Sequence, residues 1–537
     1  PEYLEELTRH RQFVQQCFDN VFAESADGDE KRPGKLFWLE IDDEMVNEEF
    51  LHAQGFTDVA DMAEKLQTLK LKGVYRRLSN RGQELMDELM PSIIELSAGL
   101  ESPDEALSRL LSVISAIAQR ESYLALLVEV PSAVKQLTRL CAASSWITEV
   151  IIQHPALLDE LVDPRQLYEP PDRDEINFQL ARMLAEMDTD DVEVQMERLR
   201  SFRQAQQLRI ASSDIMQTMP LMRVSDNLTW VAESLLVVAL ELAWDAMASR
   251  YGEPTYEVDG ERRPAQFGII GFGKLGGIEL GYGSDLDLVF VHDSRGQSQV
   301  TNGDKSVENG MFFTRLAQRL VHILSTLTPS GVLYEVDMRL RPNGKSGMLV
   351  SSLEAMQAYQ LEEAWTWEHQ ALVRARPVAG GNDVCAGFQA IRDRVLAQER
   401  DLEKLAGEVI DMRRRMREEL DKSTSSQFDL KQGIGAIVDI EFMVQYAVLG
   451  HAARHPELLE FTDNIRMIEA AARAGLITQE RAQGLIDAYR EYRACLHHRV
   501  LQGLDRCVDN SEFEAQRALV KDAWQELFKT ELEEQAR

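Results

Sequence analysis

Residues 267–293 read FGIIGFGKLGGIELGYGSDLDLVFVHD, and this stretch decides the expected fold. A glycine-rich loop containing Lys274 leads from one short apolar strand into another. Side chains alternate between the two faces of a strand, so Asp285 and Asp287 are predicted to project to the same side. Two carboxylates fixed in this way bind a divalent metal ion, and a glycine loop beside them can bring backbone N–H groups close to phosphate oxygens. The stretch therefore predicts metal-dependent phosphoryl or nucleotidyl transfer.

A third strand is predicted at 332–341, and it carries its own polar face. Asp337, Arg339 and Arg341 alternate along it, so that one face presents a carboxylate followed by two guanidinium groups. If this strand lies beside the other two, three aspartates converge, and such a triad can hold two Mg²⁺ ions ~3.5–4 Å apart. The arginines would then neutralise phosphate charge. The alternative for the arginines is a set of surface ion pairs, which are common and weak.

The glycine loop also matches a different motif. Gly271, Gly273 and Gly276 fit the dinucleotide-binding fingerprint G-x-G-x-x-G, which follows a strand. That fingerprint needs a helix directly after the glycines and an acidic residue ~20 positions further on. The next strand begins by Asp285, which leaves no room for a crossover helix. The sequence therefore disfavours NAD binding, and it contains no Walker A motif.

Composition excludes several classes of partner. The 537 residues include 90 Asp or Glu and 58 Lys or Arg, which gives a net charge of −32. Long nucleic-acid backbones and anionic membranes need clustered Lys and Arg, so neither partner nor a polymerase role is expected. Five cysteines without a C-x-x-C pair indicate free thiols in a reducing cytoplasm. The most apolar helix candidate, 228–247, contains three acidic residues and is predicted to be a buried core helix.

The coarse pattern is helical on both sides of a compact strand-rich part. A helix is predicted to begin at Ser102-Pro103-Asp104-Glu105, with Ser as N-cap. Asp259-Gly260 predicts a hairpin turn. Strands are expected at 267–270 and 286–291, and an amphipathic helix at roughly 311–327. From about Leu353 onward the chain is predicted to be almost wholly helical.

Three charged clusters are predicted to be structural. Asp439 and Glu441 lie on a predicted helix and point ~200° apart, so they cannot easily share a metal ion. The run 411–415 (DMRRR) is predicted to be a solvated helix face. The pair His497-His498 lacks zinc-ligand spacing and is predicted to lie on a helix surface.

The segment 365–370 (WTWEHQ) and the arginines after it leave two alternatives open. The first is a helix packed against the sheet, because aromatic clusters usually belong to a core. The second places Arg374 or Arg376 near the phosphates of a nucleotide.

Taken together, these motifs resemble the glutamine synthetase adenylyltransferase family. The resemblance rests on 273–277 (GKLGG), 283–288 (GSDLDL), 336–342 (VDMRLRP) and 365–376 (WTWEHQALVRAR). Members are bacterial and bifunctional, with two nucleotidyltransferase domains of the DNA-polymerase-β type in one long chain. Because this chain carries a single such constellation, it resembles about half of the full enzyme. The wording of the motifs is similar to the C-terminal half, which attaches AMP from ATP to a tyrosine of glutamine synthetase.

The resemblance implies an α+β fold, predominantly helical, in which a small mixed sheet forms the nucleotidyltransferase domain and helical domains flank it. The implied domains are a helical connecting region at 1–165, a catalytic domain at 166–385 and a C-terminal helical bundle at 386–537.

The resemblance also implies roles for individual residues. Asp285, Asp287 and Asp337 would be catalytic and would hold two Mg²⁺ ions, with Asp337 accepting the proton of the tyrosine that attacks the α-phosphate of ATP. The implied nucleotide-binding residues are Gly273, Lys274, Gly276, Gly277, Ser284, Arg339, Arg341, Arg374 and Arg376. In the family, the PII signal protein and glutamine regulate the enzyme.

Two other functions stay open at this stage. The same site could remove AMP from glutamine synthetase by phosphorolysis, as the N-terminal half of the family does, because both reactions need the same metals and phosphate pocket. The chain could also be a helical regulatory scaffold with a silent nucleotidyltransferase domain.

Overall fold

The structure is a computed structural model that describes residues 33–41, 47–186, 191–530 and 532. The chain divides into two compact units. The first contains the described residues up to Ala142 together with Ile151–Leu158, and the second contains Ala143–Val150 together with the described residues from Asp159 onward. The three-domain division stays a prediction.

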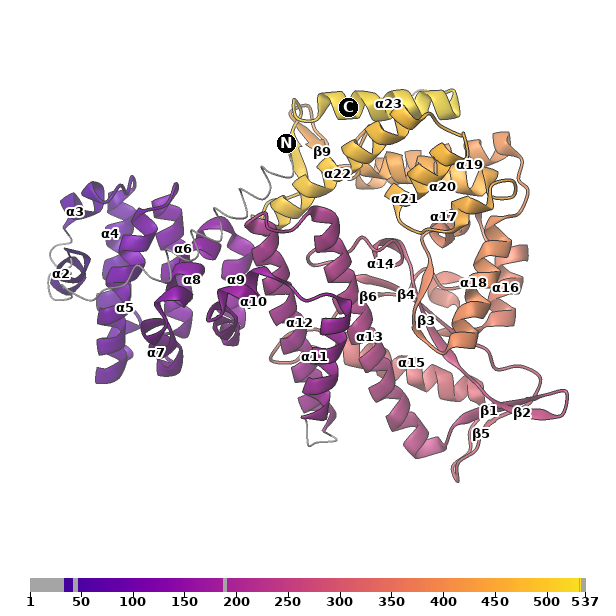
Figure 1. The fold of residues 1–537 in the computed structure, drawn as a ribbon, viewed down its shortest axis with the longest axis horizontal. Helices are drawn as coiled ribbons and strands as arrows, with labels where there is room; N and C mark the ends of the chain where they lie inside the picture. The colour runs from indigo at the N-terminus through magenta and orange to yellow at the C-terminus, as the bar shows by residue number, and fades with distance from the viewer. Residues whose placement is uncertain (1–32, 42–46, 187–190, 531, 533–537) are drawn as a thin grey trace. The chain divides into compact units, whose positions relative to one another are not determined.

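The first unit is built from helices, drawn in indigo and violet in Figure 1. A helix begins at Pro103 with Ser102 as N-cap, as predicted, although the Ser102 side chain makes no capping bond. The Asp104 carboxylate instead accepts hydrogen bonds from the backbone of Thr57 and Asp58. The main helices are α2 (Pro33–Glu40), α3 (Glu48–Ala53), α4 (Val59–Gln67), α5 (Asn80–Ala98), α6 (Pro103–Ile117), α7 (Glu121–Glu129) and α8 (Pro131–Ala143).

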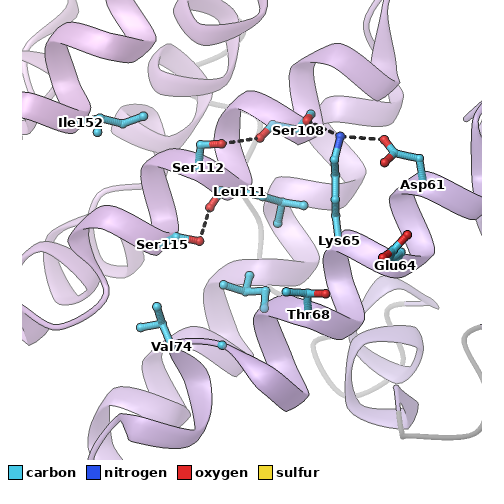
Figure 2. Close-up of a pocket in the computed structure, with 12 residues that line it drawn as sticks. Asp61, Glu64, Lys65, Thr68, Val74, Ser108, Leu111, Ser112, Ser115 and Ile152 are labelled. Carbon is cyan, nitrogen blue, oxygen red and sulfur yellow. Dashed lines mark hydrogen bonds and ion pairs between the residues drawn. The ribbon is translucent and has the colours of Figure 1, made fainter.

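A hollow of about 700 Å³ opens in this unit between α4 and α6 (Figure 2). Lys65 Nζ lies at its edge, 2.6 Å from Asp61 Oδ2 and 2.7 Å from Ser108 Oγ. The hydroxyl groups of Ser112 and Ser115 bond to carbonyls of their own helix. Because these polar groups already have partners, we assign no ligand to the hollow.

The second unit begins with helices that lead to the sheet: α10 (Pro164–Tyr168), α11 (Arg173–Ala185), α12 (Val192–Ile215) and α13 (Leu221–Tyr251). Helix α13 contains the apolar segment that was predicted to be a core helix, and most of its residues from Val224 to Leu240 are buried. Among the described residues no helix has the length and apolar character needed to cross a membrane.

A small mixed sheet carries the predicted site. Strands β3 (Phe267–Gly271) and β4 (Leu286–His292) are antiparallel and confirm the two predicted strands. The sheet order is β6-β4-β3-β8, with β6 (Val336–Asp337) parallel to β4 and β7 (Val350–Ser352) also paired with β4. The antiparallel pairing of β3 and β4 has no crossover helix, which agrees with the argument against a dinucleotide-binding fold.

Alternation along β4 explains how helices cover both faces of the sheet. On one face, His292 stacks on Phe313 of α15 (Asn309–Ser325), with ring centroids 4.7 Å apart. On the other face, Val289 and Val291 join one continuous apolar core with Phe388 and other side chains of the C-terminal helices. Both faces are therefore buried, as the unbroken apolar run of β4 requires.

A separate three-stranded sheet, β2-β1-β5, stands beside this part of the chain. The turn between β1 (Pro254–Val258) and β2 (Glu261–Pro264) is formed by Asp259 and Gly260, both with positive φ, at 54° and 78°. The Asp-Gly turn prediction is confirmed, because this backbone conformation favours those two residue types. Strand β5 (Gln297–Thr301) completes the sheet.

The predicted strand at 332–341 is mostly wrong. Only Val336 and Asp337 form a strand, and the chain then turns, with Arg341 Nη1 donating to the Met338 carbonyl at 2.8 Å. Pro342 has no N–H to extend a ladder, and Asn343 has a φ of 60°. Arg339 and Arg341 therefore do not share a strand face with Asp337.

The C-terminal part is helical, but three short strands were missed. Strand β8 (Arg376–Gly380) pairs with β3, and β9 (Gln427–Asp429) pairs with β10 (Cys507–Asp509). The helices are α16 (Leu353–Glu362), α17 (Thr366–Val373), α18 (Asn382–Leu396), α19 (Leu402–Leu420), α20 (Ile437–His451), α21 (Asn464–Arg473), α22 (Gln479–Leu501) and α23 (Glu514–Phe528). Figure 1 shows α17, α20 and α21 grouped above α14 (Gly273–Gly276), the single helical turn between β3 and β4.

Two of the structural interpretations of charged clusters need correction. Arg413 is fully buried rather than solvated, because its Nε donates to Asp439 Oδ1 at 2.6 Å. His497 is 8% exposed and packs on Tyr282, whereas its neighbour His498 is exposed as predicted. The helix prediction for Asp439 is confirmed by α20.

Candidate active site

The strand register brings two of the predicted aspartates side by side. Asp287 on β4 is paired in register with Asp337 on the parallel strand β6. Asp285 lies two residues before Asp287, immediately before β4 begins, and is exposed. The neighbouring Leu286 is fully buried and its N–H donates to the Glu335 carbonyl, which fixes the entry into the strand.

The electrostatics of Asp287 record this proximity. Burial, together with the negative charges of Asp285 and Asp337, raises its pKa to about 6. Crowded carboxylates resist ionisation because each charge disfavours the next. Gly273, with a φ of +56°, lies against the same group: a Cβ added there would meet Asp287 Oδ2 at 2.4 Å. Glycine is thus required at this position both by its backbone conformation and by the approach of the carboxylate.

Asp337 is held by Arg339. Its Oδ1 accepts the Arg339 backbone N–H at 2.8 Å, and its Oδ2 accepts Nε at 2.7 Å. These bonds lower the pKa of Asp337, so the carboxyl is ionised at neutral pH. The Arg339 side chain is largely exposed, at 69%, and the pair lies at the edge of the site.

The metal-binding triad is not fully assembled in this arrangement. Across the described ranges, no three His, Cys, Asp or Glu side chains form a group that could hold a metal ion. The residue types nevertheless fit Mg²⁺, because carboxylate oxygens are its preferred protein ligands. A divalent cation would offset the negative charge that contributes to the raised pKa of Asp287.

Lys274 and Ser284 meet across the loop between β3 and β4. Lys274 Nζ lies 3.4 Å from Ser284 Oγ, which also accepts the Gly281 N–H at 3.1 Å. The Lys274 side chain is exposed to solvent, yet enough protein surrounds its amine that desolvation lowers its pKa to about 8, with Lys431 contributing. The contact of this amine with a nucleotide stays a prediction.

Gly276 and Gly277 have a different role from the predicted one. Their N–H groups donate to the carbonyls of Phe272 and Gly273 at 2.9 and 3.0 Å, so neither is available to a phosphate. A Cβ at Gly276 would lie 1.9 Å from the Arg374 carbonyl oxygen, and one at Gly277 would meet the Arg374 guanidinium. The two glycines allow close packing of the loop against Arg374.

The three remaining arginine predictions are also not supported. Arg374 is buried and pairs with Glu279 and with Glu441, the latter at 2.7 Å. Arg376 bonds to Glu233 and, through Nε, to the Gly276 carbonyl at 3.0 Å. Arg341 donates to backbone carbonyls of its own turn. All three have structural partners, which leaves Arg339 as the exposed arginine among the four predicted.

Of the two alternatives for 365–370, the helix is confirmed, but it packs mainly on α18, α19 and α20 rather than on the sheet, and its aromatic side chains do not provide the packing. Trp365 is 70% exposed and Trp367 is 39% exposed. Helix α17 instead packs through Leu372, Val373 and the buried polar groups of Glu368 and Gln370.

The residues that hold the loop between β3 and β4 in place were not predicted from the sequence. Glu279, in the middle of the loop, is fully enclosed, and Tyr489, Arg493 and His497 reach the loop from α22. Their four-residue spacing on one helix face was the signal that could have identified them.

Comparison with known proteins agrees with this geometry. Residues 134–391, which include every predicted site residue, match the sequence model of the family described as glutamate-ammonia ligase adenylyltransferase. Residues 403–524 match the model described as GlnD PII-uridylyltransferase. A protein from Thioalkalivibrio sulfidiphilus, named bifunctional glutamine synthetase adenylyltransferase/adenylyl-removing enzyme, is 48% identical over 97% of this chain and 55% of its own length.

The chain belongs to the bifunctional glutamine synthetase adenylyltransferase family. Proteins of the same name from Pseudomonas aeruginosa and Nitrosococcus oceani are each 44% identical, over 97% and 98% of this chain and 55% of their own length. The chain thus spans about half the length of the curated members it matches, which confirms the resemblance to half of such an enzyme. The α+β, mainly helical fold expected for this family is also confirmed.

Proposed function

We propose that this chain transfers AMP from ATP to a tyrosine hydroxyl of glutamine synthetase. The observation that carries the proposal is the in-register pairing of Asp287 and Asp337 on parallel strands, with Asp285 at the strand entry. The names of relatives up to 48% identical support the choice of glutamine synthetase as the protein substrate.

In this proposal Asp285, Asp287 and Asp337 would hold Mg²⁺, two ions if the family pattern applies. When bound, Mg²⁺ neutralises charge on the phosphates of ATP. Lys274 and Ser284, which lie 3.4 Å apart, would contact phosphate oxygens. Arg339, being exposed, would exchange its bonds to Asp337 for bonds to a phosphate.

Asp337 is proposed to accept the proton of the attacking tyrosine. Asp337 is ionised at neutral pH and so can accept a proton, although its bonds to Arg339 lower its pKa and with it its basicity. Release from Arg339 would raise its basicity at the moment when the substrate arrives, because the bonds to Arg339 are the main cause of the lowered pKa.

The proposed setting follows the family resemblance. The PII signal protein and glutamine are proposed as regulators, and no nucleic-acid or membrane partner is proposed. Among the described residues, no disulfide forms between Cys141, Cys385, Cys495 and Cys507, which is consistent with a proposed location in a reducing cytoplasm.

Mass spectrometry of glutamine synthetase after incubation with this chain and Mg·ATP tests the function. We expect AMP on one tyrosine, and we expect Asp337→Asn to reduce the transfer rate by roughly 10²-fold or more, as loss of a proton acceptor does. Because the partner that Asp337 loses is the largely exposed Arg339, the variant should lower the thermal midpoint only slightly. Near-normal transfer by Asp337→Asn would contradict the assignment. A parallel incubation of modified glutamine synthetase with phosphate measures the reverse reaction.

A further inference from the structure

The loop between β3 and β4 cannot hold its own shape. Six of the residues from Gly271 to Gly283 are glycine, and its regular structure is the single turn α14. Glycines add conformational freedom and no side-chain contacts. The same loop carries Lys274, Ser284 and Asp285, whose positions matter for the proposed reaction. Something outside the loop must therefore fix it.

A strained backbone conformation marks the point at which outside contacts hold the loop. Ile278 has a φ of 55°. A β-branched residue rarely adopts this left-handed conformation, and it persists only where the surroundings over-determine it. The next residue in the chain is Glu279.

Glu279 carries the contacts that hold this strained point. Its carboxylate accepts hydrogen bonds from Arg374 Nη2, from Tyr489 Oη at 2.7 Å and from the Asn464 backbone N–H at 3.2 Å. Arg493 adds an ion pair at 3.9 Å, and its Nη2 also donates to the Glu279 backbone carbonyl at 3.1 Å. These partners come from the end of α17, the start of α21 and the middle of α22.

Glu279 is also bonded to the functional part of the loop. Its backbone N–H donates to the carbonyl of Lys274 at 2.8 Å. The carboxylate is 2% exposed, so water cannot substitute for the lost partners if the anchor is removed. Displacement of Glu279 would thus be transmitted directly to Lys274.

We infer that Glu279 is a positioning residue for AMP transfer: it anchors the loop at 272–285 to the C-terminal helices and thereby fixes Lys274, Ser284 and Asp285 relative to Asp287. The inference rests on the proposed function for its kinetic consequence. The anchor itself is a property of the fold.

The matched control is Glu441 on α20. Glu441 belongs to the same network, bonding to Arg374 Nη1 at 2.7 Å and lying 3.4 Å from Tyr489 Oη. Glu441→Gln removes the same kind of charge as Glu279→Gln, but Glu441 is not part of the loop. Both variants should lower the thermal midpoint, Glu279→Gln by more because Glu279 is more buried and has more partners, and only Glu279→Gln should strongly affect catalysis.

The experiment measures AMP transfer and hydrogen–deuterium exchange of the full chain. Glu279→Gln should lower kcat by roughly 10²-fold, the size expected for an ångström-scale misplacement of reacting groups. It should also speed exchange in peptides covering 273–285. Glu441→Gln should leave exchange in those peptides at the wild-type rate. It should lower kcat by less than about 10-fold.

A second variant separates positioning from general destabilisation. Asn tolerates a positive φ better than Ile, so Ile278→Asn relieves the strain that Glu279 counteracts. In the Glu279→Gln background, Ile278→Asn should restore part of the lost kcat and slow hydrogen–deuterium exchange in the peptides covering 273–285.

Three results would overturn the inference: equal kcat for Glu279→Gln and Glu441→Gln, equal exchange of the loop in the two variants, or no recovery in the double variant. If the wild-type chain transfers no AMP, the proposed function fails, and the exchange comparison alone decides whether Glu279 anchors the loop.

Discussion

His292 on β4 is a buried titratable residue that the proposed reaction does not use. It is 8% exposed, its ring stacks on Phe313, and its Nδ1 accepts the Ser294 N–H at 3.2 Å. Burial lowers its pKa from 6.5 to about 4. The fold therefore requires the neutral ring, since the charged form would lose its hydration without gaining a partner.

This residue predicts a specific dependence of stability on pH. Because the folded-state pKa lies below the unfolded value, the unfolded chain takes up the proton first as the pH falls. The stability is fully present above pH ~6.5 and declines toward pH ~4, by ~2–3 kcal/mol for a shift of this size. Between pH 7 and pH 4, the thermal midpoint of the wild type should fall more steeply than that of His292→Phe, which lacks the titrating ring. Parallel curves would show that His292 stays neutral in both states or is charged in both.

Among single residues, the aspartates were predictable and their supports were not. Asp285 and Asp287 follow from the alternation of a strand, which is a local rule. The roles of Glu279 and Arg374 depend on contacts that no local pattern contains, such as the bond between Glu279 and Tyr489, 210 residues further along the chain. From the sequence alone, Glu279 is predicted to be an ordinary residue of a glycine-rich loop, because its partners are not visible there.

Helix α14 depends on one position where no side chain fits. A Cβ at Gly276 would lie 1.9 Å from the Arg374 carbonyl oxygen and 2.5 Å from that of Gly271. Both neighbours are backbone atoms of the central sheet region, so they cannot move aside as a flexible side chain would. Gly276 therefore sets the distance between the loop and β8.

We expect Gly276→Ala to destabilise the protein by ~3 kcal/mol or more, the upper end for overpacking, and to abolish AMP transfer. Gly407→Ala in α19 is the matched control. A Cβ there meets nothing within 4 Å, so replacing glycine in a helix interior should stabilise by ~0.5–1 kcal/mol. Chemical denaturation of both variants checks the prediction, and it fails if Gly276→Ala unfolds at the wild-type denaturant concentration.

The elements themselves were predictable to the extent that their pattern is local. Strands β3 and β4 are short runs rich in apolar residues on either side of a glycine-rich loop, and α15 shows a clear amphipathic period. Strand β8 was missed because its sequence, Arg-Pro-Val-Ala-Gly, has poor strand propensity, and its pairing with β3 creates the strand. The predicted strand around Asp337 was too long because alternation continues into a segment that turns.

At the scale of the whole chain, a short segment far from the candidate site in sequence belongs to the second compact unit. Residues Ala143–Val150 group with the unit that begins again at Asp159. Ser144 Oγ donates to the Leu501 carbonyl at 2.6 Å, and Gln502 Nε2 donates to the Ala143 carbonyl at 2.6 Å. Trp146 packs on Tyr282 of the site loop, with ring centroids 5.4 Å apart. The predicted boundary at 165 would separate this segment from the unit it packs against.

A comparison of two shortened chains tests this contribution. Residues 143–537 should melt at a higher temperature than residues 159–537, by at least ~2 °C, because the shorter chain loses the indole packing on Tyr282 and exposes its ring. Trp146→Ala in the full chain should lower AMP transfer, since Tyr282 precedes Ser284 and Asp285 by only a few residues. Circular dichroism melts and the transfer assay measure the two effects. The prediction is contradicted if the two fragments have equal midpoints and Trp146→Ala leaves transfer unchanged. Residues 143–150 would then make no energetic contribution to the second unit despite their contacts.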